Sequence, residues 1–280
     1  MKRQKLKLVD EQSSPLFRIT SVFNHDNPSS RKFSNNICAF HIGNGYILSV
    51  AHNLKIKFSD PTIQGARSFI DLYQSGACKP FLVLQFRNNK FYNNDLITGK
   101  INVNHIFYEE ELARYTFLIE LELVEAFYNE DFSLYKIVNT DSAVVNLIPS
   151  IEPDYRMLTN KNCNLFCLQP APFGDLGRML NDAKLEGVLD SWSKNEGDIL
   201  DGMRYLIRGY FRFGSSGAPY LIYNRITNKF KVNGIQSQAS PIQLSINGSQ
   251  AGNFQYINAI GSSLFNIKKR LKEHLKVKNV

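Results

Sequence analysis

Three polar residues, far apart in the chain, are of the types that together could hydrolyse an acyl bond. His52 follows the apolar run Tyr46–Ala51, so its imidazole would stand at a strand end as a general base. Asp131 begins an alternating segment, where a carboxylate could accept the imidazole N–H and fix its tautomer. Ser216 lies in a Gly- and Ser-rich loop whose N–H groups could converge on an oxyanion. Taken singly, each residue also fits an ordinary structural role.

The segments that must hold these residues are predicted to be β-strands. Residues 118–124 alternate with a period of two, as in a half-buried strand, and Gly43–Gly45 is typical of a hairpin turn. Many short strands at this spacing favour an antiparallel sandwich or barrel. The predicted strands are rich in Ile, Val, Phe and Tyr, and include Phe17–Val22, Ile37–Ile42, Tyr46–Ala51, Phe81–Phe86, Phe132–Val138, Asn164–Leu168, Arg204–Phe211, Tyr220–Tyr223 and Phe230–Gln236.

Two segments have a helical pattern instead. Tyr108–Tyr115 is one candidate. The other follows Ser262 or Ser263 as a cap and carries an apolar stripe with lysines on the opposite face. We expect this stripe to dock on the body, and a helix that binds a partner or a membrane surface is the alternative. The predicted organisation is a polar lead-in (1–15), two β-rich units (16–145 and 146–262) and a basic amphipathic helix (263–280).

Composition and charge exclude several classes of protein. The chain has 280 residues, 43% of them hydrophobic, which is enough for a sizeable core without disulfides. It has no apolar run of membrane-spanning length and no visible signal peptide. The net charge is +8, but residues 1–7 carry four of these charges and residues 268–278 a net five. The body is therefore nearly neutral, and we expect no specific nucleic-acid surface.

The surroundings of the three polar residues resemble the motifs of the trypsin/chymotrypsin-like serine peptidases, in the order His, Asp, Ser. The matching segments are Val50-Ala51-His52, Asp131-Phe132-Ser133-Leu134-Tyr135-Lys136 and Gly214-Ser215-Ser216-Gly217-Ala218-Pro219. The resemblance covers roughly residues 16–267. It implies an all-β fold of two antiparallel six-stranded β-barrels with a C-terminal helix, and a serine endopeptidase that acts through an acyl-enzyme. The ending, Ala259–Leu264, resembles that of the bacterial stress-protease branch.

The resemblance also implies a role for individual residues. Ser216 would be the nucleophile, His52 the base and Asp131 the orienting acid, with the N–H groups of Gly214 and Ser216 as the oxyanion hole. It places Tyr210, Ser237 and Gln238 at the substrate-binding cleft. It implies no cofactor and no metal ion.

The chain departs from the family at several positions. Asn53 replaces the Cys that follows the catalytic His in secreted members, so that disulfide cannot form, and the thiols are expected to be free in a cytoplasmic protein. Ser215 replaces an Asp that secreted members use for activation by N-terminal cleavage, so we expect a non-zymogen. Tyr210 is not an acid, which disfavours cleavage after Lys or Arg and favours small residues. Ala218 replaces a Gly.

Narrow specificity or control by a partner is expected, because an unregulated peptidase would harm its cell. The expected partners are a protein substrate and a regulatory protein in stress or defence, and contact of the basic ends with a membrane surface stays open. Three other functions are alternatives. The first is a catalytically silent, protease-like binding module. The second is an α/β-hydrolase, which would need a His after the Ser. The third is a nucleic-acid binder that uses its basic ends.

Overall fold

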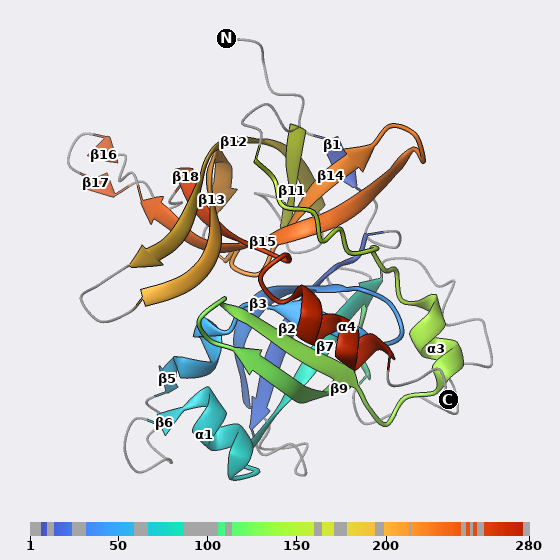
Figure 1. Ribbon diagram of the computed structural model, residues 1–280. Coiled ribbons are helices and arrows are strands. Elements are labelled where there is room, and N and C mark those ends of the chain that lie inside the picture. The colour runs from blue at the N-terminus through green and yellow to red at the C-terminus, as the bar shows by residue number, and fades with distance from the viewer. Residues whose placement is uncertain are drawn as a thin grey trace.

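The computed structural model describes residues 7–9, 14–23, 32–58, 67–86, 106–109, 114–159, 164–170, 178–193, 199–212, 214–241, 245–246, 249–250 and 255–276. Within them the chain is mostly β-strand, arranged as two barrels one above the other in Figure 1. The first predicted helix is wrong. Residues 106–109 form a strand that pairs with 114–117, so strand pairing overrides the local helical pattern.

The first barrel is formed by six antiparallel strands and closed by the pairing of β10 with β9. A seventh strand, β8 (Ile106–Glu109), extends it beside β9. The strands in barrel order are β10 (Phe132–Ile137), β4 (Tyr46–Ser49), β3 (Lys32–His41), β2 (Leu16–Phe23), β7 (Cys78–Phe86) and β9 (Arg114–Phe127).

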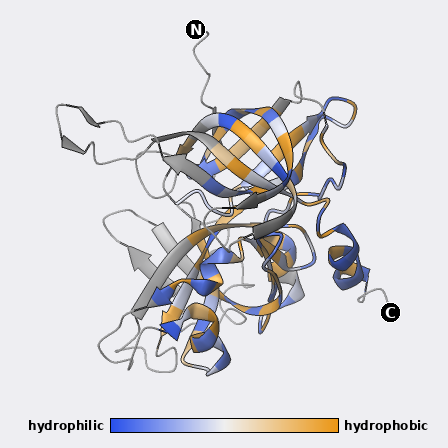
Figure 2. Cartoon of the chain, turned by 60° about the vertical axis from the view of Figure 1, so that its left-hand side comes forward, coloured by the Kyte–Doolittle hydropathy of each residue, from blue (hydrophilic) through white to orange (hydrophobic). Residues whose placement is uncertain are grey.

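The second barrel repeats this plan and is closed by the pairing of β12 with β13. The short strand β1 (Lys7–Val9), from the expected polar lead-in, pairs with β12 outside the ring. Apolar and polar residues alternate along the strands of this barrel (Figure 2). The strands in order are β12 (Arg178–Ser193), β11 (Asn164–Pro170), β14 (Pro219–Asn224), β15 (Lys229–Pro241), β18 (Gln255–Ser263) and β13 (Ile199–Arg212).

Smaller elements fill the connections. They are the 3-10 helix η2 (His52–Lys55), the helices α1 (Phe69–Gln74) and α3 (Ser142–Leu147), and the two-stranded pairs β5 (Lys57–Phe58) with β6 (Arg67–Ser68) and β16 (Ser245–Ile246) with β17 (Ser249–Gln250). The segment after α3 adds a parallel bridge between Pro153 and Val232 of β15. It thereby carries the chain from the first barrel to the second.

One hydrophobic cluster contains buried residues of both barrels, beside separate clusters within the first barrel. Phe40 and Leu134 of the first barrel belong to the same buried cluster as Tyr220 and Ile235 of the second. Burial of this apolar surface favours one relative placement of the barrels, because each loses packing if the other moves away. Residues from both barrels can therefore build one site.

The C-terminal helix α4 (Lys268–Lys276) returns from the second barrel to the first (Figure 1). Leu271 is fully buried, and the main chain of His274 accepts a 3.0 Å hydrogen bond from the hydroxyl of Tyr46 in β4. The helix begins later than residue 263, because residues 264–267 form a turn in which the Asn266 side chain bonds the main chain of Met203 in β13.

Candidate active site

His52 is the first residue of η2, which follows strand β4 of the first barrel. The strand β4 before it is buried along its whole length, and Val50 and Ala51 are fully buried. The His52 side chain is 38% exposed, so the chain carries it from the rigid core out to where a substrate can reach it. The position at a strand end is the one expected from the sequence.

Asp131 lies in the turn 128–131 between β9 and β10, which we call the Asp131 turn. Its side chain is 1% exposed, and its backbone is left-handed at φ 59°. Asp is one of the few residues that adopt this conformation, because its short side chain makes local hydrogen bonds. Oδ1 accepts the main-chain N–H of Ala51 at 3.1 Å and of His52 at 2.7 Å.

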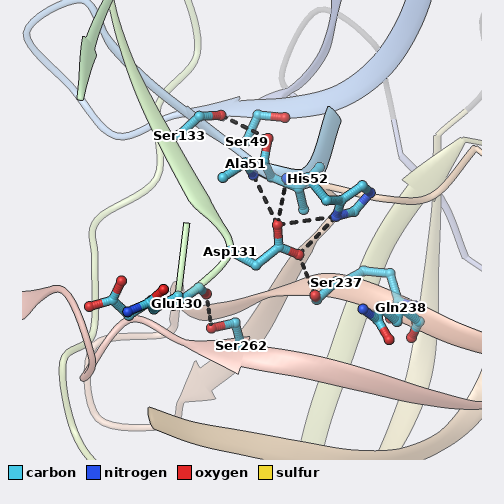
Figure 3. A network of polar contacts seen from close by, with 12 residues as sticks. Ser49, Ala51, His52, Glu130, Asp131, Ser133, Ser237, Gln238 and Ser262 are labelled. Atoms are coloured by element: carbon cyan, nitrogen blue, oxygen red, sulfur yellow. Dashed lines mark hydrogen bonds and ion pairs between the residues drawn. The ribbon is translucent and has the colours of Figure 1, made fainter. Parts of the chain in front are cut away.

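The imidazole of His52 is bonded to the same carboxylate. Its Nδ1 lies 2.9 Å from Oδ2 and 3.1 Å from Oδ1 of Asp131, and the hydroxyl of Ser237 also donates to Oδ2 (Figure 3). An ionised carboxylate only accepts hydrogen bonds, so the Nδ1 carries the proton and the Nε2 is left with a free lone pair. This is the tautomer that a general base requires.

Ser216 lies in a tight turn between β13 and β14. Gly214 and Gly217 have left-handed backbones, at φ 83° and 86°. The turn is held on both sides: the amide of Cys38 in β3 donates to the Ser216 carbonyl at 3.0 Å, and the amide of Gly217 donates to Gln236 of β15 at 2.8 Å. Within the described residues, the amides of Gly214 and Ser216 donate no hydrogen bond, so both can receive an oxyanion.

Main-chain contacts bring the three predicted residues into one neighbourhood. Gln236, bonded to Gly217, directly precedes Ser237, which is bonded to Asp131. The structure thus joins Asp131 directly to His52 and places the Ser216 turn one residue from that network. Among the contacts described, none joins the Ser216 hydroxyl to His52. In unliganded sites of this type such a bond is often long and tightens with substrate.

The residues expected to bind substrate have different surroundings. Ser237 is 1% exposed and lies at a bulge of β15, where its hydroxyl bonds Asp131. Gln238 is partly exposed beside it, and its carbonyl accepts the Gln236 side-chain amide at 2.9 Å (Figure 3). Tyr210 is in β13 near a bulge, and its side chain lies outside the described residues. Substrate binding by these three residues stays a prediction.

Two residues near Asp131 were not found from the sequence. Arg204 of β13 and Ser262 of β18 hydrogen-bond to the main chain of the Asp131 turn. Arg204 belongs to no motif, and Ser262 lies in the segment Ala259–Leu264, whose resemblance gave it no role at Asp131. The sequence pattern predicts Ser262 or Ser263 as a helix cap, but the helix begins only at Lys268.

The described residues were also compared with the requirements of a metal site and of a membrane span. In the part of the chain that is described, no three His, Cys, Asp or Glu residues gather as a metal site would require. None of the described helices is both long and apolar enough to cross a bilayer.

The arrangement of two barrels is shared with a known protease. The structure superimposes on the active form of the Rv3671c protease from M. tuberculosis with a TM-score of 0.51 and 11% sequence identity, over 93% of this chain and 81% of that chain. Two structures of inactive forms of that protease score 0.48, at 11% and 12% identity. No protein-family model and no curated protein matches the sequence. The fold is therefore the chymotrypsin-like double barrel, as the resemblance of the motifs predicted.

Proposed function

We propose that the protein is a serine endopeptidase that cleaves a protein substrate with Ser216, His52 and Asp131. The observation that carries the proposal is the hydrogen bonding of His52 Nδ1–H to the Asp131 carboxylate, whose Oδ2 and Oδ1 accept at 2.9 and 3.1 Å. They fix the tautomer of a partly exposed imidazole at the junction of the two barrels. The fold shared with a known protease supports the same assignment.

The chemistry follows from the positions of these groups. His52 Nε2 takes the proton of the Ser216 hydroxyl as the Ser216 oxygen attacks the carbonyl carbon of the scissile bond. The amides of Gly214 and Ser216 stabilise the negative oxygen of the tetrahedral intermediate. His52 then gives the proton to the leaving amine, which leaves an acyl-enzyme on Ser216. Water, deprotonated by His52, hydrolyses this ester and restores the Ser216 hydroxyl.

We further propose that activity is restricted by narrow specificity or by a regulatory protein partner. The absence of a Ser216–His52 hydrogen bond among the described contacts supports a resting state that tightens on binding. Preference for small residues rests on Tyr210 and stays a prediction, as does a role in stress or defence. A cytoplasmic location is supported by the free, buried thiols of Cys38, Cys78 and Cys167.

The second candidate function is a catalytically silent binding module, which a site without a described Ser216–His52 hydrogen bond also fits. Labelling with a fluorophosphonate separates the two, because only an activated serine reacts. We expect the wild type to be labelled at Ser216 and the Ser216→Ala variant to be unlabelled. Ser215→Ala is the matched control, which should keep the label. A wild-type protein that stays unlabelled, alone and with cell extract added as a source of partners, favours the silent module.

Cleavage itself is tested by comparing N-terminal peptide profiles of a proteome treated with wild type or Ser216→Ala. Removal of the nucleophile from a triad enzyme lowers kcat by about 10⁶-fold. New N-termini should therefore appear only with the wild type. Equal cleavage by both proteins would contradict the assignment of Ser216.

A further inference from the structure

The backbone conformation of Asp131 is only weakly stabilised by contacts within its own turn. The residue is left-handed at φ 59°, and the hydrogen bond that closes its own turn, from its amide to Tyr128, is 3.3 Å long. Asn129, in the middle of the turn, is exposed. A left-handed backbone at a residue other than glycine persists only where the surroundings determine it.

The second barrel supplies those surroundings. Arg204 Nη1 donates to the carbonyl of Glu130 at 2.9 Å, and the hydroxyl of Ser262 donates to the same oxygen at 2.6 Å (Figure 3 shows the latter). Arg204 Nη2 donates to the carbonyl of Asn129. Glu130 is covalently joined to Asp131, so these bonds fix the peptide plane from which the Asp131 side chain projects.

The two donors are built into one rigid surface. Arg204 and Ser262 face each other as register partners between β13 and β18, and both are fully buried. A buried guanidinium is retained only where it makes good hydrogen bonds, because its desolvation is costly. Strand pairing thus fixes the donors in the second barrel, while the carbonyls that they bind belong to the first.

The C-terminal helix α4 binds the side chain of Glu130, whose carbonyl Arg204 and Ser262 bind. Arg270 of α4 forms ion pairs with the carboxylates of Glu130 and, at 3.2 Å, Glu125, and its guanidinium lies 4.3 Å from the ring centre of Phe127. His274, one turn further, lies 2.6 Å from Glu125. The main chain and the side chain of Glu130 are therefore both bonded to elements outside the first barrel.

We propose that Arg204 and Ser262 are positioning residues for catalysis, with Arg270 in support: they hold the Asp131 turn so that its carboxylate stays on His52 Nδ1. The proposal rests on the proposed function. It differs from the direct contact of Ser237, because Arg204 and Ser262 touch neither the carboxylate nor the imidazole. Without them the peptide before Asp131 can rotate, and the carboxylate leaves the plane of the imidazole.

The test compares Ser262→Ala and Arg204→Met with Arg208→Met in the full chain. Arg208 lies on the same strand, is exposed, and is paired with Glu186 at 2.9 Å rather than with the Asp131 turn. Four quantities are measured on each variant: the melting temperature, kcat and KM on a peptide selected by cleavage profiling, and the proton resonance of His52 Nδ1–H. This resonance reports the hydrogen bond to Asp131 whether or not the protein turns over a substrate.

Displacing a catalytic group by about 1 Å costs on the order of 10²-fold in rate. We expect kcat to fall about 10-fold in Ser262→Ala and about 10²-fold in Arg204→Met, with KM within about two-fold and a weakened Nδ1–H resonance. Ser262→Thr, which keeps the hydroxyl, should restore kcat and the Nδ1–H resonance. Arg208→Met should match the wild type. If Arg204→Met does not fold, the positioning role is tested by Ser262→Ala alone, which loses only one hydroxyl.

Two results would overturn the positioning role. One is a folded Ser262→Ala protein with wild-type kcat and an unchanged Nδ1–H resonance. The other is an equal loss of kcat in Arg208→Met. A wild type that shows the Nδ1–H resonance yet neither cleaves peptides nor reacts with a fluorophosphonate would instead contradict the proposed function. In that case the resonance in Ser262→Ala still tests the positioning role by itself.

Discussion

The amide of Cys38 donates a 3.0 Å hydrogen bond to the carbonyl oxygen of Ser216, which joins a strand of the first barrel to the residue proposed as nucleophile in the second. The next residue, Gly217, packs against the same strand, and a Cβ built on it would lie 2.0 Å from the Cys38 carbonyl oxygen. The hydroxyl of Ser49 donates to that oxygen at 2.7 Å, so the carbonyl is held from the other side.

Gly217→Ala should therefore be among the most damaging small substitutions in the chain. We expect it to destabilise the fold by more than about 4 kcal/mol, or to displace the Ser216 turn and abolish fluorophosphonate labelling. Gly76→Ala is the control: Gly76 is also left-handed, at φ 74°, but nothing lies within 4 Å of its Cβ position. It should cost about 1–2 kcal/mol. Urea unfolding and labelling rate measure both, and equal effects would show that crowding at Gly217 is unimportant.

Asp131→Asn should lower kcat near neutral pH by about 10⁴-fold while the protein stays folded. The amide can present an N–H to His52 Nδ1, which then favours the tautomer with its proton on Nε2. The control is Asp154→Asn. Burial raises the pKa of Asp154, but hydrogen bonds from Arg156 outweigh burial and hold the pKa below its usual value. That variant should lose stability and keep kcat, and a loss of kcat equal to that of Asp131→Asn would contradict the distinct role of Asp131.

His41 makes the stability of the first barrel sensitive to acid. Its Nδ1 lies 3.1 Å from the carbonyl oxygen of Ile148, and its Nε2 accepts the Gly45 amide at 3.0 Å, an arrangement that only the neutral ring satisfies. Burial lowers the pKa of His41. The unfolded chain therefore binds this proton more readily, and stability is lost as the pH falls below about 6.5.

Urea unfolding of wild type and His41→Gln between pH 8 and pH 5 checks this. The wild type should lose up to about 1.4 kcal/mol per pH unit more than the variant, which is less stable at pH 8 but has no imidazole at this position. Parallel curves for the two proteins would rule out His41 as the source of acid sensitivity.

The described thiols should be inert in the folded protein. Burial raises the pKa of Cys38 to about 11 and that of Cys78 to about 12, and it raises the pKa of Cys167 further. Alkylation requires the thiolate, so these three should react with iodoacetamide at pH 8 only after unfolding. Peptide mass mapping of native and urea-treated protein measures this. Fast labelling of Cys38 in the native protein would mean that the contact between the barrels opens readily.

Most of the fold followed from local patterns in the sequence. The alternating run 118–124 became part of β9, and 132–138 became β10, which is buried on both faces rather than on one. The Tyr108–Tyr115 segment misled because its helical pattern is weaker than the pairing of β8 with β9. The pairing of Lys7–Val9 with β12 had no local signal either. Both depend on a partner strand that a local pattern does not specify.

The candidate site divides in the same way. His52, Asp131 and Ser216 could be proposed from the sequence because each is embedded in a short motif. Arg204 and Ser262 were not, because their roles depend on the register of β13 against β18. A shift of that register by one residue would turn their side chains to the other face of the sheet. A role of this kind cannot be predicted from the local sequence around either residue.

The return of α4 to the first barrel has a consequence for the timing of synthesis. The first barrel, with His52 and Asp131, leaves the ribosome long before Ser262 and Arg270 do. Until then the Asp131 turn lacks its hydrogen bonds to Arg204 and Ser262 and its ion pair with Arg270, and the proposed triad is incomplete. For the proposed peptidase, the order of residues along the polypeptide therefore delays assembly of the triad until the second barrel and α4 have been made.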